Sequence, residues 1–333
     1  MTATITNSYP AVRDRIQRSA SLTATAGVEK LSFHAMGTIC RVQFKSPNAV
    51  VARAYQAGVL EWVAQFEAKY SRFLADSLIS RINAAAGEHW VEIDSETQTL
   101  LKMCAEMHFL TRGAFDPTAL PLIRLWNWKA NPPIIPDEVQ LRAARELCGW
   151  NKVQCRPGGI FLPRAGMSLD LGGIGKEYAV DCVVQLATAH GIANVLVDFG
   201  QDLCTRGAPA GKPAWHIGLE DPCNAGKCWA GVAIKDKAVA TSGDYLRHFM
   251  INGRRYGHII DPRTGYPVDN GCRAVSVIAS TCTAAGILAT TAFILGPTEG
   301  LKLIGNYMGA EGCITTNNSR HETRRFHEYV THQ

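Results

Sequence analysis

The stretch LDLGGIGKEYAVD, residues 169–181, carries the clearest structural signal in the sequence. It runs from an apolar segment, interpreted as the end of a strand, through a glycine-rich turn into a helix predicted to begin near Ile174. Such a turn frees backbone N–H groups and directs a helix N-terminus, with Lys176 in its first turn, toward an anion. A tight strand-to-helix turn that needs glycine only for packing is the alternative interpretation.

This turn does not match the common nucleotide-binding motifs. A Walker A motif requires glycine where Asp170 stands, and a GxGxxG motif lacks its last glycine after Gly175. The generic phosphate signal is therefore weak, and the rest of the chain must decide between the two interpretations.

The segments on either side of the turn predict different secondary structure. From about residue 50 to 150 the apolar spacing is mostly helical, with Asp94 and Asp137 as N-caps. From about residue 151 to 320 short β-rich runs such as NVLVDF (194–199) dominate, with helices predicted over 174–190 and 281–295. The helices predicted in the first part cover residues 50–70, 77–87, 94–113 and 137–149. We therefore predict an α+β fold with a mainly antiparallel sheet core and flanking helices.

Length and the first residues suggest a simple domain organisation. The 333 residues are enough for one large domain, and no repeat or linker marks an internal boundary. We expect residues 1–30 to form a flexible N-terminal extension and residues 31–333 to form a single domain. No signal-peptide pattern occurs in residues 1–30, so a cytoplasmic location is expected.

Composition excludes several classes of protein. Hydrophobic residues make up 47% and charged residues 19% of the chain, and the mean hydropathy is -0.04, which excludes intrinsic disorder and a membrane-protein composition. The net charge of +5 is spread without long basic runs, so neither a nucleic-acid partner nor membrane insertion is expected. The 11 cysteines form no CxxC pair, which favours buried reduced thiols over disulfides or a structural zinc site.

Two further segments group polar residues in a way that suits catalysis or binding. HIIDPRTGYP, residues 258–267, places His258 at a strand end beside a polar turn, a setting for a proton acceptor. The alternative is a turn in which Asp261 bonds only its own loop amides. GAFDPTALPLIRLW, residues 113–126, carries Asp116 ahead of a short helix, where a simple capping role is the alternative.

The order and wording of these motifs resemble the ApbE family, which comprises FAD:protein FMN transferases. The resemblance spans residues 31–309 and implies an ApbE-like, T-fold-related architecture. The matching segments are MGT (36–38), DSLISRIN (76–83), GAFDPTALPLIRLW, LDLGGIGKEYAVD, TSGDY (241–245), HIIDPRTGYP and ILG (294–296).

The resemblance implies an enzyme that binds FAD, cleaves its pyrophosphate with the help of Mg2+, and moves FMN onto a Ser or Thr hydroxyl of an acceptor flavoprotein. His258 would be the base, with Asp261 as its orienter or a partner of the metal shell, and Lys176 would add positive charge at the pyrophosphate. The residues implied to line the FAD site are Met36, Phe73, Asp116, Thr118, Gly172, Gly173, Lys176, Asp181, Ser242, Gly243, His258 and Thr264. For Phe73, a place in the hydrophobic core is the alternative.

The implied metal site departs from the family pattern. Thr290 and the backbone carbonyl of Gly175 match expected ligands, but the usual Asp is replaced by Gly286. Because Mg2+ prefers charged oxygen ligands, Gly286→Asp is expected to tighten Mg2+ binding unless another carboxylate compensates. Asp244 is the first candidate for that role, and Glu177, which stands where Gly is usual, is another. Gln201 also replaces a usual glycine.

These departures leave alternatives to an active FMN transferase. One is an FAD-binding relative that has lost transfer and serves as a flavin carrier or regulatory partner, which Gly286 favours. Another is an FAD pyrophosphatase. Lys176, His258, Asp261 and Thr290 favour transfer.

Overall fold

The computed structural model describes residues 6–25, 27–127, 130, 132–224 and 226–331. Its α-helices are α1 (Tyr9–Ser19), α2 (Ala49–Tyr70), α3 (Leu78–Ala84), α4 (Ser95–Leu110), α5 (Leu120–Leu125), α6 (Glu138–Glu146), α7 (Gly175–Ala189) and α8 (Cys282–Asn306). Its strands are β1 (Ser21–Thr25), β2 (Val28–Ala35), β3 (Thr38–Lys45), β4 (Val91–Glu92), β5 (Gln154–Arg156), β6 (Gly159–Phe161), β7 (Asn194–Phe199), β8 (Asp202–Arg206), β9 (Trp215–Glu220), β10 (Cys228–Ile234), β11 (Ala238–Gly243), β12 (His248–Ile251), β13 (Arg254–Gly257), β14 (Cys272–Ala279), β15 (Glu311–Thr316), β16 (Arg320–Glu322) and β17 (Val330–Thr331).

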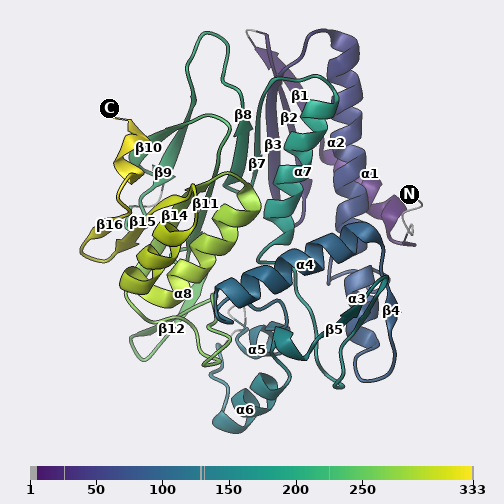
Figure 1. Ribbon diagram of the computed structural model, residues 1–333, viewed down its shortest axis with the longest axis vertical. Coiled ribbons are helices and arrows are strands. Elements are labelled where there is room, and N and C mark those ends of the chain that lie inside the picture. Colours follow the sequence, from purple (N-terminus) through teal and green to yellow (C-terminus); the bar gives the residue numbers. More distant parts are fainter. Residues whose placement is uncertain (1–5, 26, 128–129, 131, 225, 332–333) are drawn as a thin grey trace.

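A nine-stranded sheet organises the molecule. Its strand order is β1-β2-β3-β7-β8-β11-β14-β15-β16, and every neighbouring pair is antiparallel. The predicted α+β fold with a mainly antiparallel sheet is therefore confirmed. The helical segment from α2 to α6 is inserted between β3 and β7, so strands from both ends of the chain complete one sheet (Figure 1).

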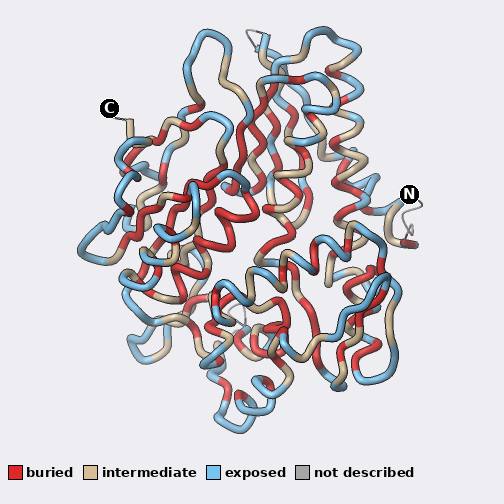
Figure 2. Tube along the Cα trace, viewed as in Figure 1, coloured by how far each residue is buried: buried red, intermediate tan, exposed pale blue. Residues whose placement is uncertain are grey.

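Helices cover one face of this sheet and a small second sheet covers the other. Helix α7 packs on β7 and β8, and α8 packs on β11, β14 and β15, with α2 beside α7 (Figure 1). The second sheet, ordered β17-β10-β9, buries Trp215 and Val232 against Leu196 and Val239 of the large sheet. Figure 2 shows the buried residues concentrated along the central strands and the helix faces turned toward them.

Helix boundaries follow the local signals in the sequence. The Asp94 side chain accepts a hydrogen bond from the Thr97 N–H at the start of α4, and Asp137 forms a capping box with Gln140 at the start of α6. Helix α7 begins at Gly175 with Ile174 as N-cap, within one residue of the prediction. The apolar residues 169–171 are wrongly predicted as a strand: they are unpaired, and the Leu169 backbone is bonded by the Asn83 side chain instead.

The N-terminal residues correct the expectation of a flexible extension. Residues 9–25 form α1 and β1, which pack on α2 and pair with β2. Val12 and Ile16, one helical turn apart, are buried in the main core. This short apolar stripe, together with the pairing of β1 with β2, attaches the segment, and two residues are too few to stand out in a polar sequence.

Helix α8 is apolar because it is a core helix. By length and composition alone it could cross a membrane, and it is the one helix of the described residues that could. Its backbone breaks at Gly296, with φ 83°, directly before Pro297, so neither half reaches the about 20 residues that a span requires. Its N-terminal half is almost wholly buried against β11 and β14.

All 11 cysteines are unbridged, as predicted. Cys104 and Cys148 are buried, whereas Cys155, Cys223 and Cys228 are exposed. Burial raises the pKa of the Cys148 thiol to about 12, so this thiol remains protonated and packs as a small apolar side chain.

The contact between α8 and the sheet predicts where the fold is most sensitive. Leu288 on α8 is 0% exposed within the main core, so Leu288→Ala should lower the free energy of unfolding by about 2–5 kcal/mol through loss of burial and a residual cavity. Met308→Ala is the matched control, because Met308 is 94% exposed and should change it by less than about 0.5 kcal/mol. Urea unfolding of both variants measures the difference, and equal effects would contradict the packing described.

Candidate functional site

The glycine turn before α7 leaves the helix N-terminus uncapped. Ile174 and Gly175 donate their N–H groups to the Leu171 carbonyl, at 3.0 and 2.6 Å, and no side chain caps the helix. The N–H of Gly172 is bonded by Asp170 at 3.0 Å. The arrangement suits an anion at the start of α7, as the sequence predicts.

Lys176 already has acidic neighbours in this structure. Its Nζ is ion-paired with Asp202 at the start of β8 and lies 3.4 Å from Oε1 of Glu177. One cation is therefore shared by two carboxylates. The role predicted for Lys176, positive charge beside a pyrophosphate, requires it to lean away from Asp202 when a ligand is present.

Gln201 lies in the turn just before Asp202. Its φ is 75°, a conformation in which glycine is relaxed and a side chain is strained, which explains why a glycine would serve well at this position. The Gln201 N–H donates to Asp198 at 2.8 Å and so holds the turn.

Asp181 ties the two long helices of this region together. Its Oδ1 accepts from the N–H of Cys282 at 2.7 Å, and its Oδ2 accepts from the N–H and the hydroxyl of Thr283 at 2.9 and 2.7 Å. Burial raises the pKa of this carboxyl group despite these bonds. Both oxygens are thus engaged in holding the start of α8 to α7, and the FAD contact predicted for Asp181 stays a prediction.

Gly286 on α8 faces Glu177 on α7. A Cβ atom at position 286 would lie 2.6 Å from Cγ of Glu177 and 3.3 Å from its Oε1. The expectation that Gly286→Asp alone improves metal binding is therefore revised, because the added side chain would collide with Glu177. The two departures from the family pattern occupy one space, which the sequence could not indicate because they lie on different helices.

The TSGDY segment leads from the sheet toward His258. The Ser242 hydroxyl lies 2.7 Å from that of Thr290 on α8, and the Asp244 carboxylate accepts from Arg255 Nη2 at 2.9 Å. Asp244 is buried and is ion-paired with Arg255, and its predicted role as a substitute metal ligand stays a prediction. Gly243 packs closely on the Arg273 backbone, where a Cβ atom would lie 2.8 Å from the carbonyl oxygen.

His258 directly follows β13 and is oriented by a backbone carbonyl. Its Nδ1 lies 3.2 Å from the Arg247 oxygen, and its N–H donates to the same oxygen at 3.1 Å. A carbonyl can only accept, so Nδ1 carries the proton and Nε2 keeps its lone pair. Burial, with the nearby Arg247 charge, lowers the pKa of His258 from its usual value of about 6.5 to about 4.

Asp261 does not orient His258 among the described contacts. Its carboxylate accepts from Nε and Nη2 of Arg263 at 2.9 and 2.8 Å and from the Arg263 N–H at 2.9 Å. Thr264 and Gly265 donate their N–H groups to the Asp261 carbonyl. The turn interpretation thus describes Asp261 in this structure, and its predicted catalytic role stays a prediction.

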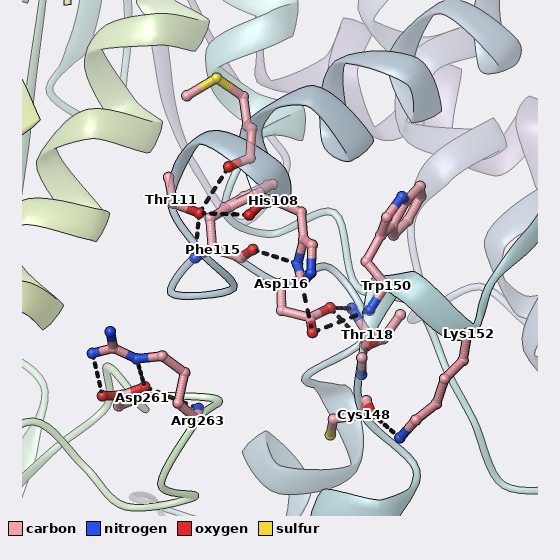
Figure 3. A network of polar contacts seen from close by, with 12 residues as sticks. His108, Thr111, Phe115, Asp116, Thr118, Cys148, Trp150, Lys152, Asp261 and Arg263 are labelled. Atoms are coloured by element: carbon pink, nitrogen blue, oxygen red, sulfur yellow. Dashed lines mark hydrogen bonds and ion pairs between the residues drawn. The ribbon is translucent and has the colours of Figure 1, made fainter.

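Asp116 and Thr118 form a compact buried network, shown in Figure 3. Oδ1 of Asp116 accepts from the Thr118 N–H and hydroxyl at 2.8 and 2.6 Å, and Oδ2 lies 3.8 Å from His108 Nδ1. The Thr118 hydroxyl in turn accepts from the Gly149 N–H at 2.6 Å. These bonds fix the loop that precedes α5, and the role predicted for both residues in FAD binding remains untested.

A basic cavity of about 510 Å³ opens beside this network. Asp116 and Arg263, which come from separate segments of the chain (Figure 3), both line it, as do Arg142, Arg145 and Lys152. Cations outnumber carboxylates in this lining, which favours an anionic ligand. The contribution of α6 was not predicted from the sequence, although Arg142 and Arg145 stand at the i and i+3 spacing that places two side chains on one helix face.

Met36 is half-buried at the edge of the main core, whereas Phe73 lies outside it. Met36 forms the left-handed turn between β2 and β3, with φ 50°, and its N–H donates to Glu67 on α2 at 2.9 Å. The Phe73 side chain is 80% exposed, with the Arg72 guanidinium 4.3 Å from the ring centre. Its exposure rules out the core alternative and leaves the ring free to stack on a ligand.

Each predicted motif contacts the next one around the site. The Asp170 N–H donates to the Pro117 carbonyl, which joins the glycine turn to the Asp116 loop. Trp126, at the end of α5, donates its indole N–H to the Gly265 carbonyl at 2.7 Å, which joins that segment to the turn after His258.

The remaining contacts lead from the hairpin before His258 back to the start of α7. Arg255, in the hairpin before His258, binds Asp244 of TSGDY, Ser242 of TSGDY contacts Thr290 on α8, and Gly286 on α8 meets Glu177 in the first turn of α7. Four of the motifs and helix α8 thus surround one region. Such convergence is what a shared ligand site requires.

This region offers hard oxygen donors but no complete metal site made by protein alone. Within the described ranges, no group of three or more His, Cys, Asp or Glu side chains could hold a metal ion. Mg2+ is commonly bound by one or two carboxylates together with substrate phosphates and water. The Glu177 carboxylate and the Thr290 hydroxyl fit that donor type.

Comparisons with known proteins agree with the arrangement of motifs. The ApbE family matches residues 36–314. A protein of Treponema pallidum named FAD:protein FMN transferase is 35% identical over 297 residues, which are 84% of this chain and 82% of that protein. A Vibrio cholerae protein of the same name is 29% identical over 300 residues, covering 87% of this chain and 90% of its own.

Solved structures show the same similarity in three dimensions. The ApbE protein of Thermotoga maritima superimposes with a TM-score of 0.83 at 31% identity, covering 92% of this chain and 100% of that one. The flavin transferase ApbE of Vibrio cholerae has a TM-score of 0.81 at 26% identity, covering 93% and 99%.

The environment of His258 predicts its protonation state. At pH 5.5 the ring should be neutral, because burial and the Arg247 charge lower the pKa of His258 to about 4. Its proton should be on Nδ1, which faces the Arg247 carbonyl. Nitrogen-15 NMR of the imidazole measures both properties, with His258→Asn used to assign the signal. A midpoint near pH 6.5, or a proton on Nε2, would contradict the contact with the Arg247 carbonyl.

Proposed function

The chain belongs to the ApbE family, and we propose that it is an FAD:protein FMN transferase. FAD is its substrate, and an acceptor flavoprotein receives the FMN. The observation that supports this function is the series of contacts that joins the motifs around the start of α7. All of these contacts lie within the segment that matches the family.

The reaction exchanges one phosphorus–oxygen bond for another. A Ser or Thr hydroxyl oxygen of the acceptor attacks the FMN phosphorus of FAD, the bond to the AMP phosphate breaks, and AMP leaves. Catalysis of such a step depends on positioning and on neutralising charge more than on covalent participation by the protein.

Residues at the start of α7 supply the anion-binding part of this chemistry. The uncapped helix N-terminus after Gly172 and Gly173 and the Lys176 ammonium would face the pyrophosphate. Glu177, Thr290 and the Gly175 carbonyl would hold Mg2+, which when bound supplies positive charge to the phosphate oxygens.

His258 accepts the proton of the attacking hydroxyl. Its Nε2 is the free lone pair, since Nδ1 is held by the Arg247 carbonyl. A base that is neutral throughout pH 5–8 remains competent over that whole range, and activity governed by His258 should fall only as the pH approaches about 4.

A direct assay separates transfer from the alternatives. Incubation of the chain with FAD, Mg2+ and an acceptor flavoprotein domain should add the mass of FMN to the acceptor, with release of AMP. Release of free FMN and AMP without modified acceptor would instead identify a pyrophosphatase. FAD binding with neither product would identify a flavin carrier.

Substitution of His258 tests the base. His258→Asn should slow single-turnover transfer by about 10²–10⁴-fold and leave FAD affinity within a few-fold, because the base acts on the acceptor hydroxyl. His216→Asn, at an exposed position on β9, is the control and should leave transfer unchanged. Joint loss of thermal stability and FAD affinity, or unimpaired transfer, would remove His258 from catalysis.

A further inference from the structure

Glu177 is a buried carboxylate with an unsatisfied oxygen. The residue is 7% exposed, and its Oε2 has no hydrogen-bond partner among the described residues. Its Oε1 has one distant neighbour, Lys176 Nζ at 3.4 Å. A carboxylate oxygen that is removed from water without a partner is costly, so a ligand is expected at Oε2.

The surrounding charges leave a deficit of positive charge. Lys176 is also ion-paired with Asp202. Burial is the main cause of the raised pKa of Asp181, and the nearby charge of Glu177 raises it further. Both oxygens of Asp181 accept hydrogen bonds from the N–H groups and the hydroxyl at the start of α8. One lysine therefore faces more negative charge than it can balance.

Gly286 makes the room for this carboxylate. With an ideal Cβ at position 286 only 2.6 Å from Glu177 Cγ and 3.2 Å from Cδ, any side chain there would displace Glu177. Glycine in a helix interior is unfavourable, so its presence in buried α8 has a packing reason. Glu177 on α7 thus fills the space that a side chain at 286 on α8 would occupy.

A second oxygen donor lies on the same side of α8. Thr290 follows Gly286 by four residues, one helical turn, and so shares its face. Its hydroxyl already lies 2.7 Å from that of Ser242, which fixes it at the site. A carboxylate, a hydroxyl and the phosphates of a ligand form the kind of oxygen set that Mg2+ or Mn2+ accepts.

We propose that Glu177 supplies the carboxylate of a divalent-cation site at the α7–α8 junction, and that Gly286 is the small residue that admits it. The inference rests on the proposed function in that the phosphates of FAD complete the coordination. Thr290 provides the second protein oxygen, and Asp244 takes no part because Arg255 holds it.

Mn2+ binding tests this site without relying on activity. Electron paramagnetic resonance titration of the full chain with Mn2+, with and without FAD, should show a saturable site that Glu177→Gln weakens at least tenfold. Glu106→Gln, at an exposed position on α4, is the matched control and should bind like the wild type. Without metal, Glu177→Gln should melt at a higher temperature than the wild type, since a buried carboxylate with an unsatisfied oxygen is removed. Mn2+ should raise the melting temperature of the wild type alone.

Exchange of the two residues tests whether they share one space. Gly286→Asp alone should lower the melting temperature because of the contact with Glu177, whereas Glu177→Gly combined with Gly286→Asp should restore both folding and Mn2+ binding. Wild-type Mn2+ affinity in Glu177→Gln, or no Mn2+ binding by the wild type under either condition, would overturn the inference.

The outcomes also separate this inference from the proposed function. FMN transfer by a chain whose Mn2+ binding ignores Glu177 would contradict the site and leave the function standing. Glu177-dependent Mn2+ binding by a chain that transfers no FMN would support the site and contradict the function.

Discussion

The Asp181 carboxylate determines how the functional region is assembled. By accepting from two N–H groups and a hydroxyl at the start of α8, it fixes α8 against α7 at one register. That register sets Gly286 opposite Glu177 and places Thr290 one turn further along the same face. Because both helices pack on the same antiparallel sheet, their relative position is rigid, and the site inherits that rigidity.

The glycine turn and the polar loops depend on this frame. The turn before α7 is hydrogen-bonded to the Asp116 loop through the Pro117 carbonyl. Trp126, at the end of α5, donates a hydrogen bond to the turn that follows His258. These are main-chain and indole contacts, so they position backbone groups more than individual side chains. A flavin transferase needs such an arrangement, because its chemistry depends on holding phosphates, a cation and an acceptor hydroxyl in line.

Local signals in the sequence were sufficient for much of the fold. The caps at Asp94 and Asp137, the start of α7 and the strand NVLVDF follow from neighbouring residues and periodicity. Long-range attachment was not predictable: α1 packs on α2 through Val12 and Ile16, and residues 169–171 form no strand. Both depend on surfaces formed by distant parts of the chain.

The candidate site shows the same division. Motif order identified the family, but it could not reveal the partners of the site residues. Asp261 is ion-paired with Arg263, and Asp244 is ion-paired with Arg255. A backbone carbonyl orients His258. The relation between Glu177 and Gly286 was least accessible, since the two positions are over a hundred residues apart and meet only once the helices are packed. Each departure alone suggests a damaged site, whereas together they describe a relocated carboxylate.

A crystal structure of the chain with FAD and Mn2+, using anomalous scattering to locate the metal, tests this account most directly. An anomalous peak is expected at the α7–α8 junction, about 2.1 Å from a Glu177 carboxylate oxygen and beside the FAD phosphates. A metal peak away from Glu177, or FAD phosphates bound far from the start of α7, would contradict it.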